Sequence, residues 1–406
     1  MKKGWIFHAT DFQTLMYPCF MICRILGIFP YKINNSIFVI SKLYYILSTV
    51  LISVLCMLEL ENFYHLNVFT KAEFEVITLS LENNCYIILI ISIIIITFVL
   101  SSSRMRLLQT IMDISVKISP QSYQELSKLI HAKDIFGFLF VTIIIFIYIH
   151  KYGFETLQLI FGIYSVLLVF QINMLYINCV CILKTCFKEI ENSLLYIKKL
   201  VVNDKLYAPK TIYYKQKNPF LIIKLKTMKE QHLMISNTVK KLNVIFSPQL
   251  LLTITITFGA TIFGLYFHLV QWHNGFVINK DGYFIYLTFI VHHVTKMALL
   301  MWACETGKNQ ARNIGTTIHD VLNNTKNKQI KNELQLFSLQ ILHLDNTFSA
   351  KGFNVDAAFF ARVSNFLALI NKMFLVNFFI LLSDDRYHNN IYVHFTTIFH
   401  HITFLR

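Results

Sequence analysis

Long apolar segments dominate this sequence of 406 residues and restrict it to one class of fold. The clearest of them reads IILIISIIIITFVL at 87–100 and contains no charged residue. A helix needs about 20 mostly apolar residues to cross the roughly 30 Å hydrocarbon core of a bilayer. Seven segments approach that length, and they cover residues 36–58, 76–102, 135–149, 158–183, 244–270, 283–303 and 357–383. We therefore predict a protein that crosses the membrane seven times.

Composition agrees with a membrane protein of the helical kind. The chain has 55% hydrophobic and 15% charged residues and a mean hydropathy of +0.53, which is too apolar for a soluble protein of this size. The apolar runs lack the alternation of a barrel strand, and lipid cannot satisfy an open backbone, so helices are expected. Asp11 and Gln13 interrupt the first residues, so no cleavable signal peptide is predicted and the first span is expected to start insertion.

The distribution of Lys and Arg predicts the orientation, because cytosolic connections collect these residues. The connection at 103–134 carries five of them and the one at 184–243 carries thirteen, whereas those at 59–75, 150–157 and 271–282 carry one each. The basic connections and the N-terminal arm are therefore predicted to be cytosolic. An odd number of spans then places the C-terminus outside the cell, which is the reverse of a G-protein-coupled receptor.

This pattern also predicts the organisation of the chain. The expected parts are a cytosolic N-terminal arm at 1–35, spans one to six within 36–303 with a long basic cytosolic loop at 184–243, a cytosolic loop with anchor-type helices at 304–356, a seventh helix at 357–383, and an external tail at 384–406. Residues 202–220 in the long loop are predicted to form a mobile linker. The net charge of +15 lies mostly in cytosolic connections facing anionic lipid, so no nucleic-acid partner is expected.

Motifs of catalysis and of metal binding are missing from the sequence. It has no Gly-rich phosphate loop, no HExxH and no GxSxG, so we predict that the protein is not an enzyme and needs no cofactor. Six of the eight cysteines fall on the reducing side of the predicted topology. Cys56 and Cys85 approach the outside, where a bridge is possible although free thiols are commoner. The CVC at 179–181 has no further ligands near it in sequence, and no metal site is predicted.

The segment before the last span carries a family resemblance. It reads ELQLFSLQILHLDNTFSAKGFNVD at 333–356. Together with the seven spans, the cytosolic N-terminus and the long basic loop between spans four and five, it resembles the insect gustatory receptor family. The family pattern of this segment is matched by Glu333, Phe337, Leu339, Gln340, His343, Phe348, Ala350, Gly352, Phe353 and Asp356. The family's TYhhhhhQF motif is absent, and the nearest string is NFFILLSDD at 377–385, so no residue of that motif is carried over.

The resemblance implies a taste receptor of the plasma membrane that is a ligand-gated, non-selective cation channel. Its implied partners are a small-molecule tastant, membrane lipids, permeating cations and related receptors in a homo- or hetero-tetramer. The seventh helix would line the pore, with candidates Lys372, Phe378, Leu382, Asp384 and Asp385. Arg362 would lie in the cytosolic part of that helix near Asp356. Lys372 either faces the lumen or extends its side chain towards the interface, and the second is favoured.

A ligand pocket is expected between spans two to six, opening outward, because helix bundles place such sites between their helices. The candidates near the external ends are Tyr86, Tyr148, Gln158, Tyr164, Tyr266, Trp272, Tyr283, Tyr286 and His292. Aromatic residues of this kind are also ordinary interface anchors. For His292 and its neighbour His293, an interfacial or packed position is favoured over a place in the pocket.

Three alternatives stay open at this point. An insect odorant receptor would share the fold and the gating. A metabotropic seven-helix receptor would need the inverted topology, and a transporter would show inverted repeats or acidic residues at mid-membrane. Two acceptor sequons, at Asn34 and Asn323, lie on segments predicted to be cytosolic, so glycosylation of either would count against the channel topology.

Overall fold

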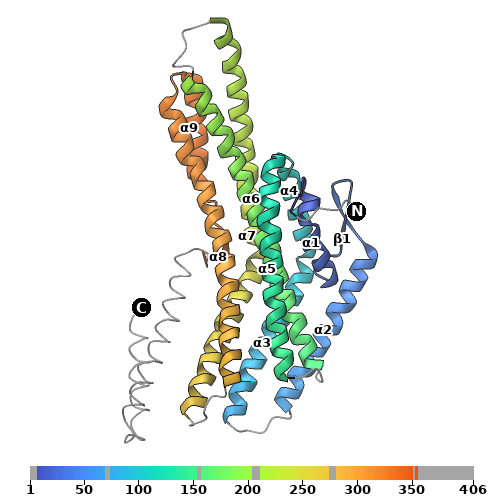
Figure 1. Cartoon of the computed structure of the whole chain (residues 1–406). Coiled ribbons are helices and arrows are strands. Elements are labelled where there is room, and N and C mark those ends of the chain that lie inside the picture. Colours follow the sequence, from blue (N-terminus) through green and yellow to red (C-terminus); the bar gives the residue numbers. More distant parts are fainter. Residues whose placement is uncertain are drawn as a thin grey trace, which may run out of the picture. The chain divides into compact units, whose positions relative to one another are not determined.

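The computed structural model describes residues 7–68, 74–152, 157–203, 211–273, 280–350 and 353–354, with side chains for most of them. The chain divides into two units, Met1–Ala357 and Ala358–Arg406. The described residues all belong to the first unit, which is a bundle of long helices (Figure 1). The helices are α1 (Phe12–Ile25), α2 (Lys42–Val68), α3 (Phe74–Val99), α4 (Ser101–Ser115), α5 (Pro120–Tyr152), α6 (Leu157–Asn203), α7 (Thr211–His273), α8 (Lys280–Asn324) and α9 (Lys328–His343).

The membrane-spanning character of the bundle is clear from the described helices. Five stretches are long and apolar enough to cross a membrane, namely Lys42–His65, Ser80–Val99, Pro120–Ile147, Leu159–Val201 and Pro219–Gly264. They overlap the first five predicted spans, which confirms a helical multi-pass membrane protein. The sixth predicted span, 283–303, lies on α8, and the seventh, 357–383, lies outside the described residues. The count of seven and the side of each terminus remain predictions.

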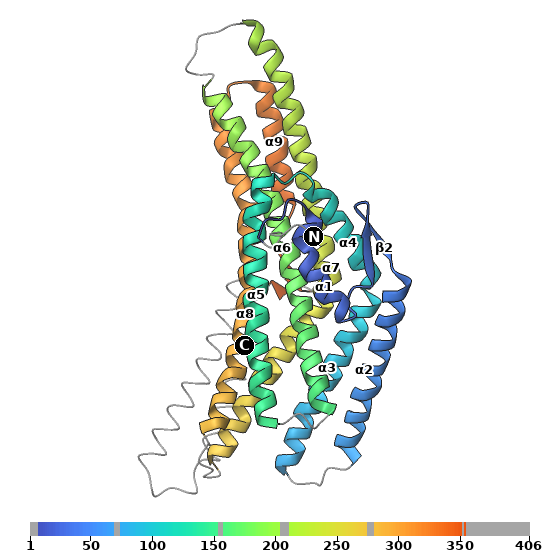
Figure 2. The ribbon, with the colours of Figure 1, turned by 45° about the vertical axis from the view of Figure 1, so that its right-hand side comes forward.

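Helix α6 forms the centre of the bundle. Leu175, Tyr176, Val180, Phe187 and Leu194 of this helix are each 0% exposed. Every residue from 168 to 183 is buried, so the middle of the helix is enclosed on all sides. The views in Figures 1 and 2 show α6 running alongside α5, α7 and α8.

The long basic connection is almost entirely helical, which the sequence analysis did not predict. Helix α6 continues to Asn203 and α7 begins at Thr211, so the predicted linker at 202–220 is wrong from Thr211 onward. With 47 and 63 residues, α6 and α7 are about 70 and 95 Å long at 1.5 Å per residue. Both are far longer than a bilayer core. Their extensions pack with α8 and α9 into a second, polar part of the bundle (Figure 2).

A β-hairpin that the sequence analysis did not predict precedes the first spanning helix of this otherwise helical bundle. Strand β1 (Tyr31–Asn34) pairs with β2 (Ile37–Ile40) in antiparallel fashion. Asn35 and Ser36 have φ of 47° and 61°, the left-handed geometry of a two-residue hairpin turn. The first span was expected from residue 36, but α2 starts only at Lys42. A second small sheet joins β3 (Ser349–Ala350) to β4 (Phe353–Asn354).

The N-terminal arm is packed against the bundle. The side chain of Asp11 accepts a hydrogen bond of 2.8 Å from the backbone of Thr14 and caps α1. His131 on α5 contacts the Leu15 carbonyl at 3.0 Å, and Gln171 on α6 donates to the Cys19 carbonyl at 3.1 Å. The arm therefore forms a fixed layer on α5 and α6. All eight cysteines are free thiols, Cys56 and Cys85 included.

Candidate functional site

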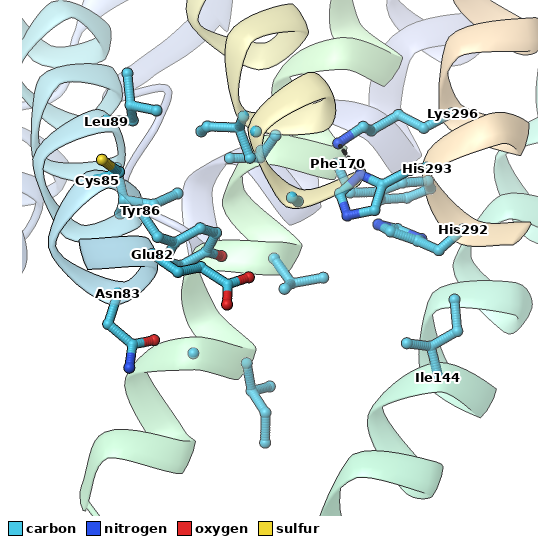
Figure 3. A pocket seen from close by; sticks show the side chains of 18 of the residues that line it. Glu82, Asn83, Cys85, Tyr86, Leu89, Ile144, Phe170, His292, His293 and Lys296 are labelled. Carbon is cyan, nitrogen blue, oxygen red and sulfur yellow. Dashed lines mark hydrogen bonds between the residues drawn. The ribbon is translucent and has the colours of Figure 1, made fainter. Parts of the chain in front are cut away.

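A cavity of about 420 Å³ lies among α3, α5, α6, α7 and α8 (Figure 3). This volume falls within the roughly 300–1,000 Å³ typical of small-molecule sites. Its lining residues include Glu82, Tyr86 and Leu89 of α3, Ile144 of α5, Gly162 and Phe170 of α6, Gly259 and Phe263 of α7, and His292, His293 and Lys296 of α8.

The walls of the cavity are largely apolar, and two glycines enlarge it. A Cβ atom added at Gly162 or at Gly259 would meet no atom within 4 Å. Both positions therefore face open space. Phe170 of α6, which is buried, and Phe263 of α7 both line the cavity, so two helices contribute aromatic surface. An apolar ligand of moderate size suits these walls.

The polar groups of the cavity stand on two opposite sides. Glu82 and Tyr86 project from α3, whereas His292, His293 and Lys296 project from one turn of α8 (Figure 3). The Nζ atom of Lys296 lies 3.4 Å from Nδ1 of His293, and the two histidine ring centroids are 5.2 Å apart. Ionisable residues within a membrane helix are rare and usually mark function. The cavity thus has an acidic side and a basic side.

The structure brings two of the predicted ligand-site candidates into the cavity. Tyr86 and His292 both line it. Tyr164 is half-buried, and its hydroxyl donates to the carbonyl of Leu26 at 2.7 Å instead of lining the cavity. The other candidates have side chains outside the described part of the structure, and these are Tyr148, Gln158, Tyr266, Trp272, Tyr283 and Tyr286.

Sequence reasoning missed several cavity residues. Lys296 and Glu82 were not named, although each is an ionisable residue inside a predicted span, which was the signal that should have singled them out. Gly162 and Gly259 carried no recognisable signal, because a helical glycine does not indicate what it faces. The pore candidates Lys372, Phe378, Leu382, Asp384 and Asp385 lie outside the described residues, as does Arg362.

Residues of the family-like segment join α9 to α7. The carboxylate of Glu333 lies 3.2 Å from Nζ of Lys229 and 3.8 Å from Nζ of Lys226. Gln340 donates to the Lys229 carbonyl at 2.9 Å. Phe337 is buried and meets the ring of His232 edge-on, with centroids 5.5 Å apart. These contacts give Glu333, Phe337 and Gln340 a structural role, whereas Leu339 and His343 are exposed.

The residues after α9 are hydrogen-bonded to α7 and packed against α8. Asn243 of α7 donates to the Thr347 carbonyl at 2.7 Å, and its amide oxygen accepts from the backbone of Ser349 at 3.3 Å. Phe348 is buried against Gly307 of α8, so closely that a Cβ at Gly307 would stand 2.8 Å from its ring. Phe353 lies in β4, and Gly352 and Asp356 are outside the described residues. The segment that leads to 357–383 is thus held against two long helices.

Comparison with known proteins identifies relatives of this chain. Residues 16–359 match the family model described as 7tm chemosensory receptor. The chain is similar to putative gustatory receptor 28b of Drosophila melanogaster, with 31% identity over 146 residues, which cover 34% of this chain and 31% of that protein. The aligned part thus spans about a third of that relative's length.

Solved structures agree on the fold. The chain is similar to the insect olfactory receptor OR5 from Machilis hrabei, with a TM-score of 0.59 and 13% identity over 91% of this chain and 98% of that one. The structure of the same receptor in complex with eugenol gives a TM-score of 0.59 and 12% identity. Since the family model covers most of the chain, and the sequence resemblance and the fold agree with it, the protein belongs to the 7tm chemosensory receptor family.

Proposed function

We propose that this protein is a taste receptor of the plasma membrane, that the 420 Å³ cavity binds its small-molecule tastant, and that binding opens a non-selective cation channel. The observation that carries the proposal is the cavity itself, a mostly apolar space of ligand size with a few ionisable side chains between five helices. A receptor of similar fold has been captured with eugenol, a small aromatic molecule, which supports a similar class of ligand here.

The predicted orientation puts this cavity towards the outside of the cell. Glu82 lies near the start of α3, which follows the predicted external connection 59–75, and Gly162 lies near the start of α6. His292 follows the start of α8 by about 18 Å of helix. A tastant would therefore enter from the external side. The lysine-rich extensions of α6 and α7 would lie in the cytosol, where positive residues are favoured.

Helix α8 connects the cavity with the segment before the predicted seventh helix. Lys296 and Gly307 are on the same helix, separated by about 16 Å at 1.5 Å per residue. Gly307 contacts Phe348, only a few residues before 357–383. We propose that ligand occupancy shifts the position of α8 and, through Phe348, the closed-to-open equilibrium of the seventh helices of a tetramer.

The seventh helix would then determine permeation. Asp384 and Asp385 would concentrate cations at the external mouth of the pore, and Lys372 would lie in its inner half. Substitution Lys372→Ala tests this arrangement. Altered relative cation permeability would indicate a lumen-facing lysine, whereas unchanged permeability would indicate that the side chain extends towards the interface.

Whole-cell recording from cells that express the full chain, alone and with related receptors, tests the proposal. We expect a tastant panel to evoke cation currents that survive block of G-protein signalling. Surface expression, measured with an epitope tag, is the control. Currents that disappear with the G-protein block, or normal surface expression without any ligand-evoked current, would refute the channel function.

An odorant receptor is the second candidate, and the fold shared with OR5 is the observation that favours it. The similarity to a gustatory receptor, 31% identity over 146 residues, supports the taste assignment more directly, since the likeness to OR5 is one of fold. The two functions share the same cavity and gating. They are separated by the ligands, since a taste receptor responds to dissolved and an odorant receptor to volatile compounds.

A further inference from the structure

The basic side of the cavity has hydrogen-bonding capacity that the protein itself does not use. A lysine ammonium group has three donors. Among the residues that the structure describes, Lys296 contacts the imidazole of His293 at 3.4 Å and forms no ion pair with a carboxylate. Its side chain lies in the predicted sixth span, where an ammonium group without a carboxylate partner is costly. An acceptor that enters the cavity at this side would therefore find an available cation.

A second small cavity adjoins the same side. It measures about 20 Å³ and shares Phe170, His292 and Lys296 with the large cavity. Asn173 of α6 lines it, is 97% buried, and has no hydrogen-bond partner for either Nδ2 or Oδ1 among the described residues. A volume of this size holds about one water-sized group. Such a buried, unpaired amide destabilises the fold unless a ligand or a water satisfies it.

Lys296 and Asn173 together suit one kind of ligand group. A carboxylate has two acceptor oxygens, so it can accept from the ammonium of Lys296 and from the amide Nδ2 of Asn173 at the same time. A cationic head group would be repelled by Lys296. Glu82 stands on the opposite side of the cavity, which disfavours the reversed orientation of an anion (Figure 3). The apolar walls, including Phe170 and Phe263, then remain for the body of the ligand.

We propose that the cavity recognises a monocarboxylate with an apolar body, whose carboxylate binds Lys296 and Asn173. This inference rests on the proposed function of the cavity as a ligand site. The carboxylate can belong to an acid dissolved outside the cell or to a free fatty acid of the bilayer. The chemistry at Lys296 is the same for both sources.

Binding to the full-length protein in lipid nanodiscs tests the inference without any need for a current. The readout is the rise in thermal unfolding midpoint with ligand concentration. The probes are hydrocinnamate, its methyl ester, the corresponding primary amine phenylpropylamine, and oleate. We expect hydrocinnamate to bind at least about tenfold more tightly than the ester. The amine is repelled by Lys296 and, among the lining residues, can be held only by Glu82 on the opposite side, so Lys296→Met should not weaken its binding. Binding of oleate in place of hydrocinnamate supports the same subsite and assigns the source to the membrane.

Variants of Lys296 and Asn173 identify the groups responsible. Lys296→Met should weaken hydrocinnamate binding by about 10- to 100-fold, Lys296→Arg should retain it, and Asn173→Leu should weaken it by about three- to tenfold. Ester binding should stay within about twofold in all three, which shows that the cavity is intact. Lys308→Met is the matched control, because Lys308 is on the same helix, outside the cavity residues.

Two results would overturn the inference. The first is equal binding of the acid, the ester and the amine. The second is unchanged binding of hydrocinnamate to Lys296→Met, and a buried water would then be the partner of Asn173. The inference and the proposed function fail separately. Carboxylate binding without evoked current contradicts only the channel, whereas currents evoked by neutral tastants without carboxylate binding contradict only the subsite.

Discussion

Single residues control the volume of the cavity, and Gly259 is the most direct of them. Its missing side chain leaves open space within 4 Å. We expect Gly259→Ala to change ligand sensitivity by less than about threefold, and Gly259→Leu to reduce it by at least about tenfold, because the larger side chain occupies ligand volume. Dose–response curves of ligand-evoked current provide the measurement. Equal effects of Ala and Leu would argue against a ligand in this space.

Arg104 is a buried cation with few hydrogen-bond partners to offset the cost of removing its charge from water. It is 2% exposed, and its guanidinium donates to the Thr97 carbonyl while Nε and Nη1 lack partners among the described residues. Burial lowers the pKa of Arg104 to about 10. A base with a lowered pKa in the folded state destabilises the fold at every pH below that value, and this cost declines only as the pH rises above about 10.

This cost leads to a stability prediction. Arg104→Met keeps the length of the side chain and removes the buried charge, so we expect stability to stay equal or to rise by about 1–3 kcal/mol at neutral pH. The thermal unfolding midpoint in nanodiscs measures it. Arg106→Met, two residues further along the same helix and exposed, is the control with an expected change below about 0.5 kcal/mol. A marked loss of stability in Arg104→Met alone would mean that the charge has a partner, such as a lipid phosphate.

At the scale of elements, the contact between α8 and the segment after α9 is the junction whose role can be tested. A Cβ at Gly307 would stand 2.8 Å from Phe348 and 3.2 Å from Val180, both shorter than ordinary contacts. Gly307→Ala must displace Phe348, and we expect the half-maximal ligand concentration to shift by at least about threefold, or a basal current to appear. Dose–response recording with surface labelling measures both.

The same helix offers a matched control for Gly307→Ala. A Cβ at Gly315 would lie 3.8 Å from Ile341, an ordinary van der Waals distance. Gly315→Ala changes the same residue type on α8 without displacing a neighbour, and its dose–response curve should match that of the unchanged protein. If the two alanine variants behave alike, the contact with Phe348 has no part in gating.

Some of these helices and strands could be predicted from the sequence and others could not. The apolar spans were predictable because length and hydropathy are local properties. The extensions of α6 and α7 were missed because the thirteen lysines of this connection indicated a loop. Ile190, Leu194 and Ile197 nevertheless recur at helical spacing, and all three are buried. The hairpin before α2 was missed because its strands have four residues each.

The cavity was predictable only in part, for a physical reason. Tyr86 and His292 were found because aromatic and imidazole side chains near the external ends of spans are typical ligand contacts. Their convergence with Lys296 and Glu82 depends on how five helices pack, and no local pattern contains that information. Asn173 has no distinguishing context in the sequence, and its significance comes only from its buried, unpaired amide.

At the scale of the whole molecule, the orientation in the membrane is the property on which the proposed channel function depends. Asn34 and Asn323 are exposed sequon residues on segments predicted to be cytosolic. We expect neither to be glycosylated, and an N-terminal epitope tag to be detected only after permeabilisation, because positive residues hold both segments inside. A mass shift sensitive to a glycosidase, or labelling of the tag on intact cells, would reverse the topology and favour a metabotropic receptor.

Helix α8 has a further mechanical consequence. It contains no proline between Lys280 and Asn324, so it can tilt as a nearly rigid lever. Lys296 stands about 42 Å of helix away from Asn324. A tilt of about 5° around the cavity would swing the far end through roughly 4 Å over that arm. In the predicted topology, a ligand that shifts its immediate neighbours by a fraction of an ångström would thereby move the cytosolic end of α8 by the width of an atom.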